Sequence, residues 1–182
     1  MSYVFDTYCN LFSSYPPSRG GIGKLKPGCF STVINLMFGM AVSATPDGRK
    51  NFEAISENLG ACRTAHSDKN RSGPTSYARS IGKLDHAKAG SGTLINMKFG
   101  VDTISGETGR DNFIEFVDGY FSNDPLHVQF MVADRETLLD AQKNPEEYQD
   151  LLVRVSGFSS YFHSLSKGFQ DELINRTESS FD

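Results

Sequence analysis

Apolar side chains recur at helical spacing near both ends of the chain. Residues 2–15 carry this pattern and a Pro-Pro pair ends it, so a helix is expected there. Over residues 165–178 the apolar positions are interleaved with charged ones. This pattern predicts an amphipathic terminal helix with Asp171, Glu172 and Arg176 on its outer face.

The most continuous apolar stretch covers residues 27–42. It is rich in β-branched and aromatic side chains, it does not alternate, and the turn-forming segment 45–48 closes it. A strand buried on both faces has this pattern. A short core helix remains an alternative, because a continuous apolar run does not distinguish the two. The polar segment 48–74 is expected to be a long connection lying on the surface.

Helical and strand patterns alternate through the rest of the chain. Pro74 opens a helix whose apolar residues lie at i, i+4 and i+7. The later elements are expected as a strand over 93–99, a helix through 113–120, a strand over 126–133, and short helices near 137–142 and 145–152. This alternation predicts an α/β arrangement with parallel strands. About three strands are too few to close a barrel.

The charge of the chain is slightly acidic and is spread along its length. The 182 residues include 18 Lys and Arg against 22 Asp and Glu, a net charge of −4. Scattered basic residues create no cationic field for nucleic acids or acidic lipids. The run 32–42 is about half of the ~20 apolar residues that a membrane span needs. We therefore expect a soluble, cytoplasmic domain that binds neither nucleic acid nor membranes.

The cysteines and histidines show no pattern of metal ligands. Cys9, Cys29 and Cys62 are far apart, and none belongs to a Cys-x-x-Cys pair. The 4 histidines have no cysteine or acidic partner at the spacing of a zinc site. We expect no bound metal, and thiols that are buried and structural in a reducing compartment.

A single glycine interrupts the apolar segment 151–162. Gly157 loses more backbone entropy on folding than another residue would, and it supplies no side chain to pack. It therefore weakens any strand or helix that contains it. The ordinary explanation of such a glycine is a tight turn with positive φ, or close packing of a neighbouring backbone. Something in this region is therefore expected to require the missing Cβ.

Several segments resemble the glycyl radical enzymes, in the same order along the chain. Residues 154–158, Arg-Val-Ser-Gly-Phe, look like the C-terminal signature of that family. The other similar segments are 44–49, 73–86, 92–99, 127–142 and 162–178. The similarity is closest to the branch that contains dehydratases, carbon–nitrogen and carbon–sulfur lyases, arylacetate decarboxylases and fumarate-adding synthases.

The resemblance implies that residues 1–182 are the C-terminal radical domain of such an enzyme, an α/β fold of few strands and helices. It places the last barrel strands at about 27–42, 93–99 and 126–133, the glycyl radical loop at 153–162 and the terminal helix at 165–178. By itself this portion would be an incomplete barrel.

The resemblance also implies that Gly157 stores an organic radical introduced after translation. A separate radical S-adenosylmethionine enzyme, which holds the [4Fe-4S] cluster, would introduce it. A Cα radical is stabilised when its carbon becomes planar, and only glycine lacks a side chain that would crowd the flanking planar peptides.

The loop around Gly157 is expected to protect the radical and yet to open for activation. The immediate environment of the radical would be formed by Arg154, Val155, Ser156 and Phe158. The apolar side chains suited to hide it from oxygen and water are those of Val155, Phe158, Tyr161 and Phe162. Because activation requires access to Gly157, we expect the loop and the terminal helix to detach more readily than the strands.

Members of the family pass the radical from glycine to a cysteine, whose thiyl radical attacks the substrate. That cysteine resembles Gly-Cys-x-Glu far upstream of the glycine. Cys29 follows Gly28 but no acid follows it, and neither Cys9 nor Cys62 fits the pattern. The chain is therefore expected to need a larger partner that supplies the thiyl cysteine, and to be inactive without it.

Three origins of such a chain remain open. It would be a subunit of a split, oxygen-sensitive lyase of anaerobic metabolism, a fragment of a longer chain, or a noncatalytic repair module that replaces an oxygen-cleaved radical domain. The resemblance is also compatible with a dimer of the assembled enzyme. An apolar part of the substrate site would be lined by Thr32, Ile34, Leu36 and Phe130, and these residues do not identify the substrate.

Overall fold

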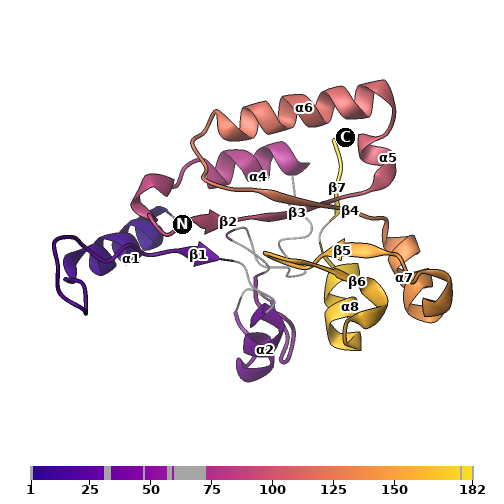
Figure 1. Ribbon diagram of the computed structural model, residues 1–182, viewed down its shortest axis with the longest axis horizontal. Helices are drawn as coiled ribbons and strands as arrows, with labels where there is room; N and C mark the ends of the chain where they lie inside the picture. The colour runs from indigo at the N-terminus through magenta and orange to yellow at the C-terminus, as the bar shows by residue number, and fades with distance from the viewer. Residues whose placement is uncertain are drawn as a thin grey trace.

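The computed structural model describes residues 2–30, 34–46, 48–56, 59, 73–176 and 178–181. The elements are, in order, α1 (Ser2–Ser14), β1 (Cys29–Phe30), α2 (Ile34–Ala41), α4 (Gly73–Ile81), η1 (His86–Lys88), β2 (Thr93–Leu94), β3 (Asn96–Phe99), α5 (Val101–Ile104), α6 (Gly106–Phe121), β4 (Gln129–Val132), α7 (Arg135–Lys143), η2 (Pro145–Glu147), β5 (Leu152–Arg154), β6 (Ser159–Tyr161), η3 (Phe162–Ser164), α8 (Lys167–Ile174) and β7 (Glu178–Ser179). Helices and strands are mixed along the whole chain, so the fold is α/β (Figure 1).

The central sheet is parallel and has the strand order β4-β3-β7. All of β3 pairs in register with β4, and its last two residues, Lys98 and Phe99, pair with Glu178 and Ser179 of β7. The parallel pairing of β3 and β4 needs a crossover, which α5 and α6 provide. A second parallel pair joins β1 to β2, whereas β5 and β6 form an antiparallel hairpin. The prediction of an α/β fold with parallel strands and no closed barrel is confirmed for the part of the chain that the structure describes.

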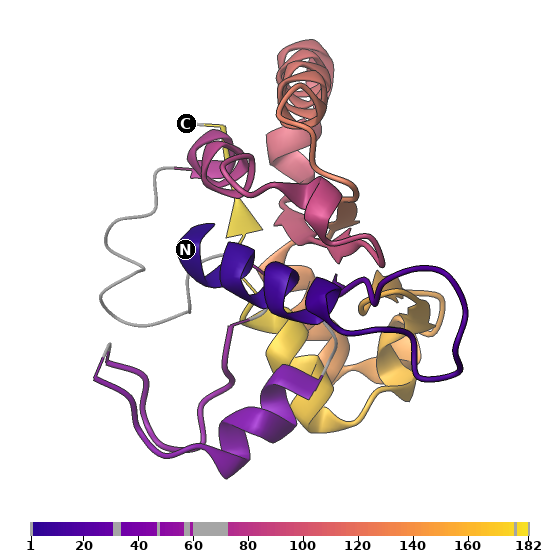
Figure 2. The same cartoon turned by 90° about the vertical axis from the view of Figure 1, so that its left-hand side faces the viewer.

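Helices cover both sides of the central sheet (Figures 1 and 2). On the side of α4 and α6, the fully buried Phe99 contacts four aromatic rings at centroid distances of 5.4–5.9 Å. These rings belong to Phe113, Phe116, Phe130 and Phe181. On the other side, α7, α8 and the hairpin share a second core built from Met131, Ala133, Leu138, Ala141, Val153, Val155, Phe162, Leu173 and Ile174. The sheet thus connects two separate hydrophobic clusters.

The C-terminal strand β7 is held to β3 by more than its backbone. The side chain of Lys98 is 1% exposed, and its Nζ lies 3.3 Å from Oε2 of Glu178. Burial lowers the pKa of Lys98, and the Glu178 carboxylate partly offsets that effect. Phe181, just beyond β7, stacks on Phe99 with an interplanar angle of 29°. An ion pair and a stacked ring therefore bind the C-terminal tail to the central strand.

The predicted strand over 27–42 is wrong at residues 34–41, which form the helix α2. The buried residues of α2 are Asn35 and Gly39, one helical turn apart, whereas Met37 and Phe38 on its other face are more than half exposed. The apolar run therefore reflects an exposed apolar face and not a strand buried on both sides. Residues 31–33 lie outside the described residues, as does most of the predicted connection 48–74.

The other expected elements differ from the structure mainly in their ends. Residues 2–15 and 165–178 contain α1 and α8, and residues 93–99 contain β2 and β3 with Ile95 between them. The helix expected near 145–152 is a single 3-10 turn followed by β5. The short strands β5, β6 and β7 were not predicted, since two or three residues are too few for a recognisable alternation. None of the described helices is both long and apolar enough to cross a membrane.

Replacing Phe99 by Ala is expected to lower the free energy of unfolding by about 3–5 kcal/mol, because it removes the ring at the centre of the aromatic cluster. Phe121 supplies a matched control, since its ring is 47% exposed at the end of α6. Chemical denaturation followed by circular dichroism should show a change below about 1 kcal/mol for Phe121→Ala. Equal losses in the two variants would contradict the central place of Phe99.

Candidate functional site

Gly157 lies in the turn that joins β5 to β6. The two strands pair with Leu152 opposite Tyr161 and Arg154 opposite Ser159. The turn is closed by the carbonyl of Phe158, which accepts hydrogen bonds from the backbone N–H groups of Val155 (3.0 Å) and Ser156 (3.3 Å). The hairpin therefore presents Gly157 at its tip, one residue after Ser156.

The fold itself does not require glycine at position 157. Gly157 is exposed, and no atom outside its chain neighbours lies within 4 Å of the place where a Cβ would stand. Its φ also lies outside the positive range that favours glycine. Both ordinary explanations, a turn with positive φ and close backbone packing, are therefore excluded.

The apolar side chains near Gly157 differ in where they are buried. Val155 and Phe162 are buried, but in the core that the hairpin shares with α7 and α8. Phe158 and Tyr161 are 52% and 50% exposed. Gly157 itself is exposed in the described chain, so these four side chains do not bury it here, and their role as a shield of the radical stays a prediction.

A polar contact joins the hairpin to the central sheet. The Arg154 guanidinium donates from Nε (3.1 Å) and Nη2 (2.9 Å) to Oε1 of Gln129, at the start of β4. Gln129 in turn donates from its amide to Oδ1 of Asn96 on β3. Bidentate pairing fixes the orientation of the guanidinium as well as its position. Arg154, predicted as part of the radical environment, thus orients the hairpin on the sheet.

The residues predicted to line the substrate site are not brought together. Ile34 and Leu36 lie on α2, and Leu36 approaches Gly168 on α8. Phe130 lies in the aromatic cluster beside α6, where it contacts Phe99 and Phe113. Thr32 is outside the described residues. Phe130 thus packs in the core of the described chain, and its part in a substrate site stays a prediction.

The described cysteines lie away from Gly157. Cys9 is buried and Cys29 half-buried in the small core between α1 and η1, with Phe5 and Leu84. Burial is the main cause that raises the pKa of both thiols. Cys62 is outside the described residues. Cys9 and Cys29 therefore pack in this core, and their raised pKa disfavours the thiolate form.

No group of three His, Cys, Asp or Glu side chains that could hold a metal ion occurs among the described residues. The buried His86 is fully used within the fold: its Nδ1 lies 2.9 Å from the Thr93 hydroxyl and its Nε2 lies 2.9 Å from the carbonyl of Ile81. Because that carbonyl can only accept, Nε2 carries the proton and Nδ1 accepts from Thr93.

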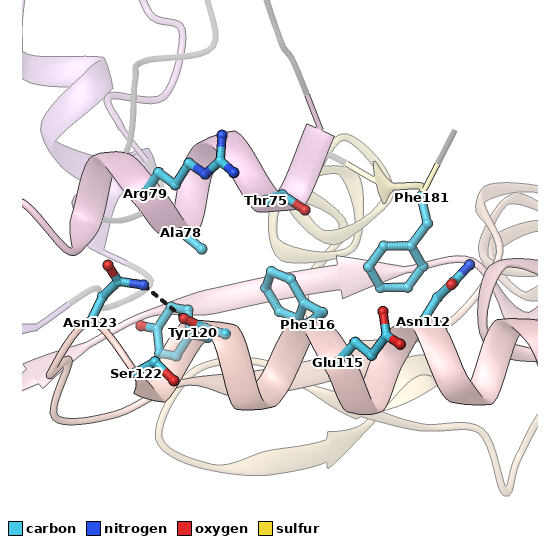
Figure 3. A pocket seen from close by; sticks show the side chains of 11 residues that line it. Thr75, Ala78, Arg79, Asn112, Glu115, Phe116, Tyr120, Ser122, Asn123 and Phe181 are labelled. Atoms are coloured by element: carbon cyan, nitrogen blue, oxygen red, sulfur yellow. Dashed lines mark hydrogen bonds between the residues drawn. The ribbon is translucent and has the colours of Figure 1, made fainter.

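A groove of about 570 Å³ lies between α4 and α6 (Figure 3), on the other side of the central sheet from the hairpin (Figure 1). Aromatic side chains of Phe116, Tyr120 and Phe181 form its base, and Arg79 and Glu115 extend along its rim. Burial raises the pKa of Tyr120, whose hydroxyl donates to the carbonyl of His127. No residue of the hairpin lines this groove, so it is separate from Gly157.

Comparison with known proteins gives one consistent result. The family described as "Glycine radical" matches residues 61–163, a segment that contains Gly157. The chain is 41% identical over 179 residues to (2S)-3-sulfopropanediol dehydratase of Klebsiella oxytoca, covering 98% of the chain and 21% of that protein. It is 39% identical over 181 residues to trans-4-hydroxy-L-proline dehydratase of Clostridioides difficile, covering 100% of the chain and 22% of that protein.

Solved structures show the same relation. The chain superimposes on the glycerol-bound B12-independent glycerol dehydratase of Clostridium butyricum with a TM-score of 0.88 and 41% identity, over 98% of the chain and 22% of that structure. The hydroxyproline dehydratase of Clostridioides difficile gives a TM-score of 0.87 and 38% identity. The chain therefore spans about a fifth of the length of the relatives that it matches.

Gly157→Ala is expected to change the free energy of unfolding by less than about 1 kcal/mol, because an added Cβ at this tip meets no other atom. Gly39→Ala on α2 is the matched control, since its Cβ would collide with the backbone of Glu53 and Ala54 and should cost about 1–3 kcal/mol. Thermal unfolding of the two variants measures the difference. A large loss of stability in Gly157→Ala would mean that the fold itself needs this glycine.

Proposed function

Since the chain belongs to the glycyl radical family, we propose that Gly157 is the residue that stores the radical. The observation that carries this proposal is the contrast between sequence and fold at this position. A glycine interrupts an apolar segment within the matched region, yet neither its backbone conformation nor its surroundings require a missing Cβ. The chemistry of the residue then explains it better than its packing.

A radical at Gly157 would form by loss of one hydrogen atom from Cα. The carbon then becomes planar and shares its unpaired electron with the peptide groups on both sides, which a side chain would hinder by crowding them. The exposed tip of the hairpin leaves this Cα–H accessible to a second protein. An activating enzyme of the radical S-adenosylmethionine class would remove the hydrogen atom.

The stored radical would next be passed to a cysteine on a larger polypeptide. In that step the S–H bond breaks, its hydrogen atom returns to Cα of Gly157, and the unpaired electron remains on sulfur. Cys9 and Cys29 are packed in the core beside α1, which supports a cysteine outside these residues. The larger polypeptide is either a separate chain or the remainder of a longer protein.

The reaction of the assembled enzyme would be a lyase reaction on a small molecule. The relatives named above are dehydratases, and others are named indoleacetate decarboxylase and isethionate sulfite-lyase. A larger polypeptide would also cover the exposed apolar side chains at the hairpin, Leu152, Phe158 and Tyr161, and on α2, Met37 and Phe38. Covering the hairpin in this way would exclude oxygen and water from Gly157.

Anaerobic activation followed by exposure to air tests the radical assignment. After incubation with an activating enzyme, electron paramagnetic resonance should show a doublet from the single remaining α-hydrogen, and air should then cleave the chain at Gly157. Mass spectrometry would identify the released C-terminal peptide. The Gly168→Ala variant, altered at an exposed glycine of α8 where a Cβ meets only Leu36 at 3.4 Å, should behave like the wild type. A doublet that persists in Gly157→Ala would reject the assignment.

Complementation distinguishes a split enzyme from a repair module. The chain is mixed with a large glycyl radical polypeptide that retains its thiyl cysteine but carries Ala in place of its own radical glycine. Turnover after activation is expected if this chain supplies the radical. Rescue confined to an enzyme already cleaved by oxygen would indicate repair, and the Gly157→Ala chain should give no turnover in either mixture.

A further inference from the structure

Three polar side chains in and just after α8 are buried in the protein interior. Gln170, Glu172 and Arg176 are 9%, 5% and 9% exposed, although their pattern predicted an outer face for Glu172 and Arg176. That expectation is wrong because both side chains point toward the hairpin and α2. Burying two charged groups is costly unless they are paired and hydrogen-bonded, so these residues need a structural or functional reason.

Arg176 holds the backbone immediately before Gly157. Its Nη1 donates to the carbonyl of Arg154 (3.2 Å) and its Nη2 to the carbonyl of Val155 (2.6 Å). These are the last carbonyl of β5 and the first of the turn, where the pairing of β5 with β6 ends. A planar guanidinium can hold two neighbouring carbonyls at once, which an ammonium group does less well.

Glu172 holds Arg176 in place and connects it to α2. The Arg176 Nε lies 3.1 Å from Oε2 of Glu172, and both side chains are buried. The other carboxylate oxygen, Oε1, accepts from the side-chain amide of Asn35 on α2 at 3.2 Å. Figures 1 and 2 show α2 beside α8, as this contact requires. Asn35, Glu172 and Arg176 thus form one buried chain of contacts from α2 to the hairpin.

The other end of the hairpin is held by a residue of α8 itself. Gln170 donates from Nε2 to the carbonyl of Phe162 at 3.0 Å, in a buried position just after β6. Val155, Phe162 and Leu173 share the apolar core beneath. Backbone carbonyls therefore attach one end of the hairpin to Gln170 of α8 and the other to Arg176 just after α8, and Gly157 lies in the turn just beyond the carbonyl of Val155.

We propose that Arg176 is a positioning residue for Gly157: it holds the turn end of β5, at Arg154 and Val155, beside the end of α8 and thereby sets where the Cα of Gly157 lies. The proposal rests on the proposed role of Gly157. Transfer of a hydrogen atom requires donor and acceptor in near contact, so a small displacement of the tip slows transfer strongly. Removal by an activating enzyme that approaches an open hairpin tolerates such a displacement better.

Hydrogen exchange tests the structural part of this proposal without any radical. In Arg176→Gln the amides of Val155, Ser156 and Phe162 should exchange roughly tenfold faster or more, as expected for the loss of buried hydrogen bonds to a charged donor. Arg176→Lys keeps the positive charge opposite Glu172 but loses the planar guanidinium that bonds two carbonyls, so it should give a smaller increase in the exchange rate. This variant can still be measured if Arg176→Gln does not fold.

Arg135→Gln is the matched control. Arg135 also donates to the C-terminal end of α8, from Nη1 to the carbonyl of Ile174 at 2.9 Å, but it makes none of the contacts that hold the hairpin. Exchange at Val155, Ser156 and Phe162 should stay as in the wild type. Unchanged exchange in Arg176→Gln and Arg176→Lys, or an equal increase in Arg135→Gln, would overturn the proposal.

The effect of Arg176 on radical transfer is tested by measuring the amount of radical and the turnover separately. In the complementation mixture, Arg176→Lys should reach at least the wild-type amount of radical signal while its turnover per radical falls roughly tenfold. A variant that loses signal and turnover in proportion would be merely less folded, which contradicts a positioning role. Absence of any radical in the wild-type chain would instead refute the role of Gly157 and leave the exchange result unaffected.

Discussion

The parallel pairing of β3 with β4 and β7 is the constraint on which the rest of this fold depends. It places the ring of Phe99 among four others on one side, and it positions β4 so that Met131 joins the core of the hairpin on the other. The same strand holds the C-terminal tail through Lys98 and Glu178. Segments far apart in the chain, from α4 to β7, are therefore assembled around one short strand.

Polar side chains bond backbone carbonyls at the ends of several strands and helices of this fold. Arg176 and Gln170 bond carbonyls at the two ends of the hairpin, and Arg49 bonds the carbonyls of Val42 and Glu53 around α2. His86 does the same for the end of α4. Since buried carbonyls must be satisfied, these side chains supply hydrogen bonds that no backbone N–H group of a strand or helix supplies at these positions.

Two glycines show how differently the missing side chain is used. Gly39 is buried on α2, where the backbone of Glu53 and Ala54 fills the space of a Cβ, so its role is packing. Gly157 stands at an open tip in a conformation that any residue can adopt. Its neighbours Val155 and Phe162 are turned into the core, which leaves the Cα exposed while the hairpin base stays anchored. A hairpin whose strands are anchored in the core while its turn is accessible suits a site that has to contact another protein.

Local patterns along the chain were enough to locate α1, α6, the strand segments β2 and β3, and Gly157, because each depends on spacing or on a residue type that neighbours cannot change. The interior position of Arg176 and the helical state of residues 34–41 depend on what lies opposite them. The exposed apolar face of α2 resembled a buried strand, and Glu172 of α8 and Arg176 just after it, which are buried, resembled solvent-exposed residues. Burial is a property of contacts between distant segments, here Asn35 with Glu172 and Arg176 with Val155, and so it emerged only once the chain was folded.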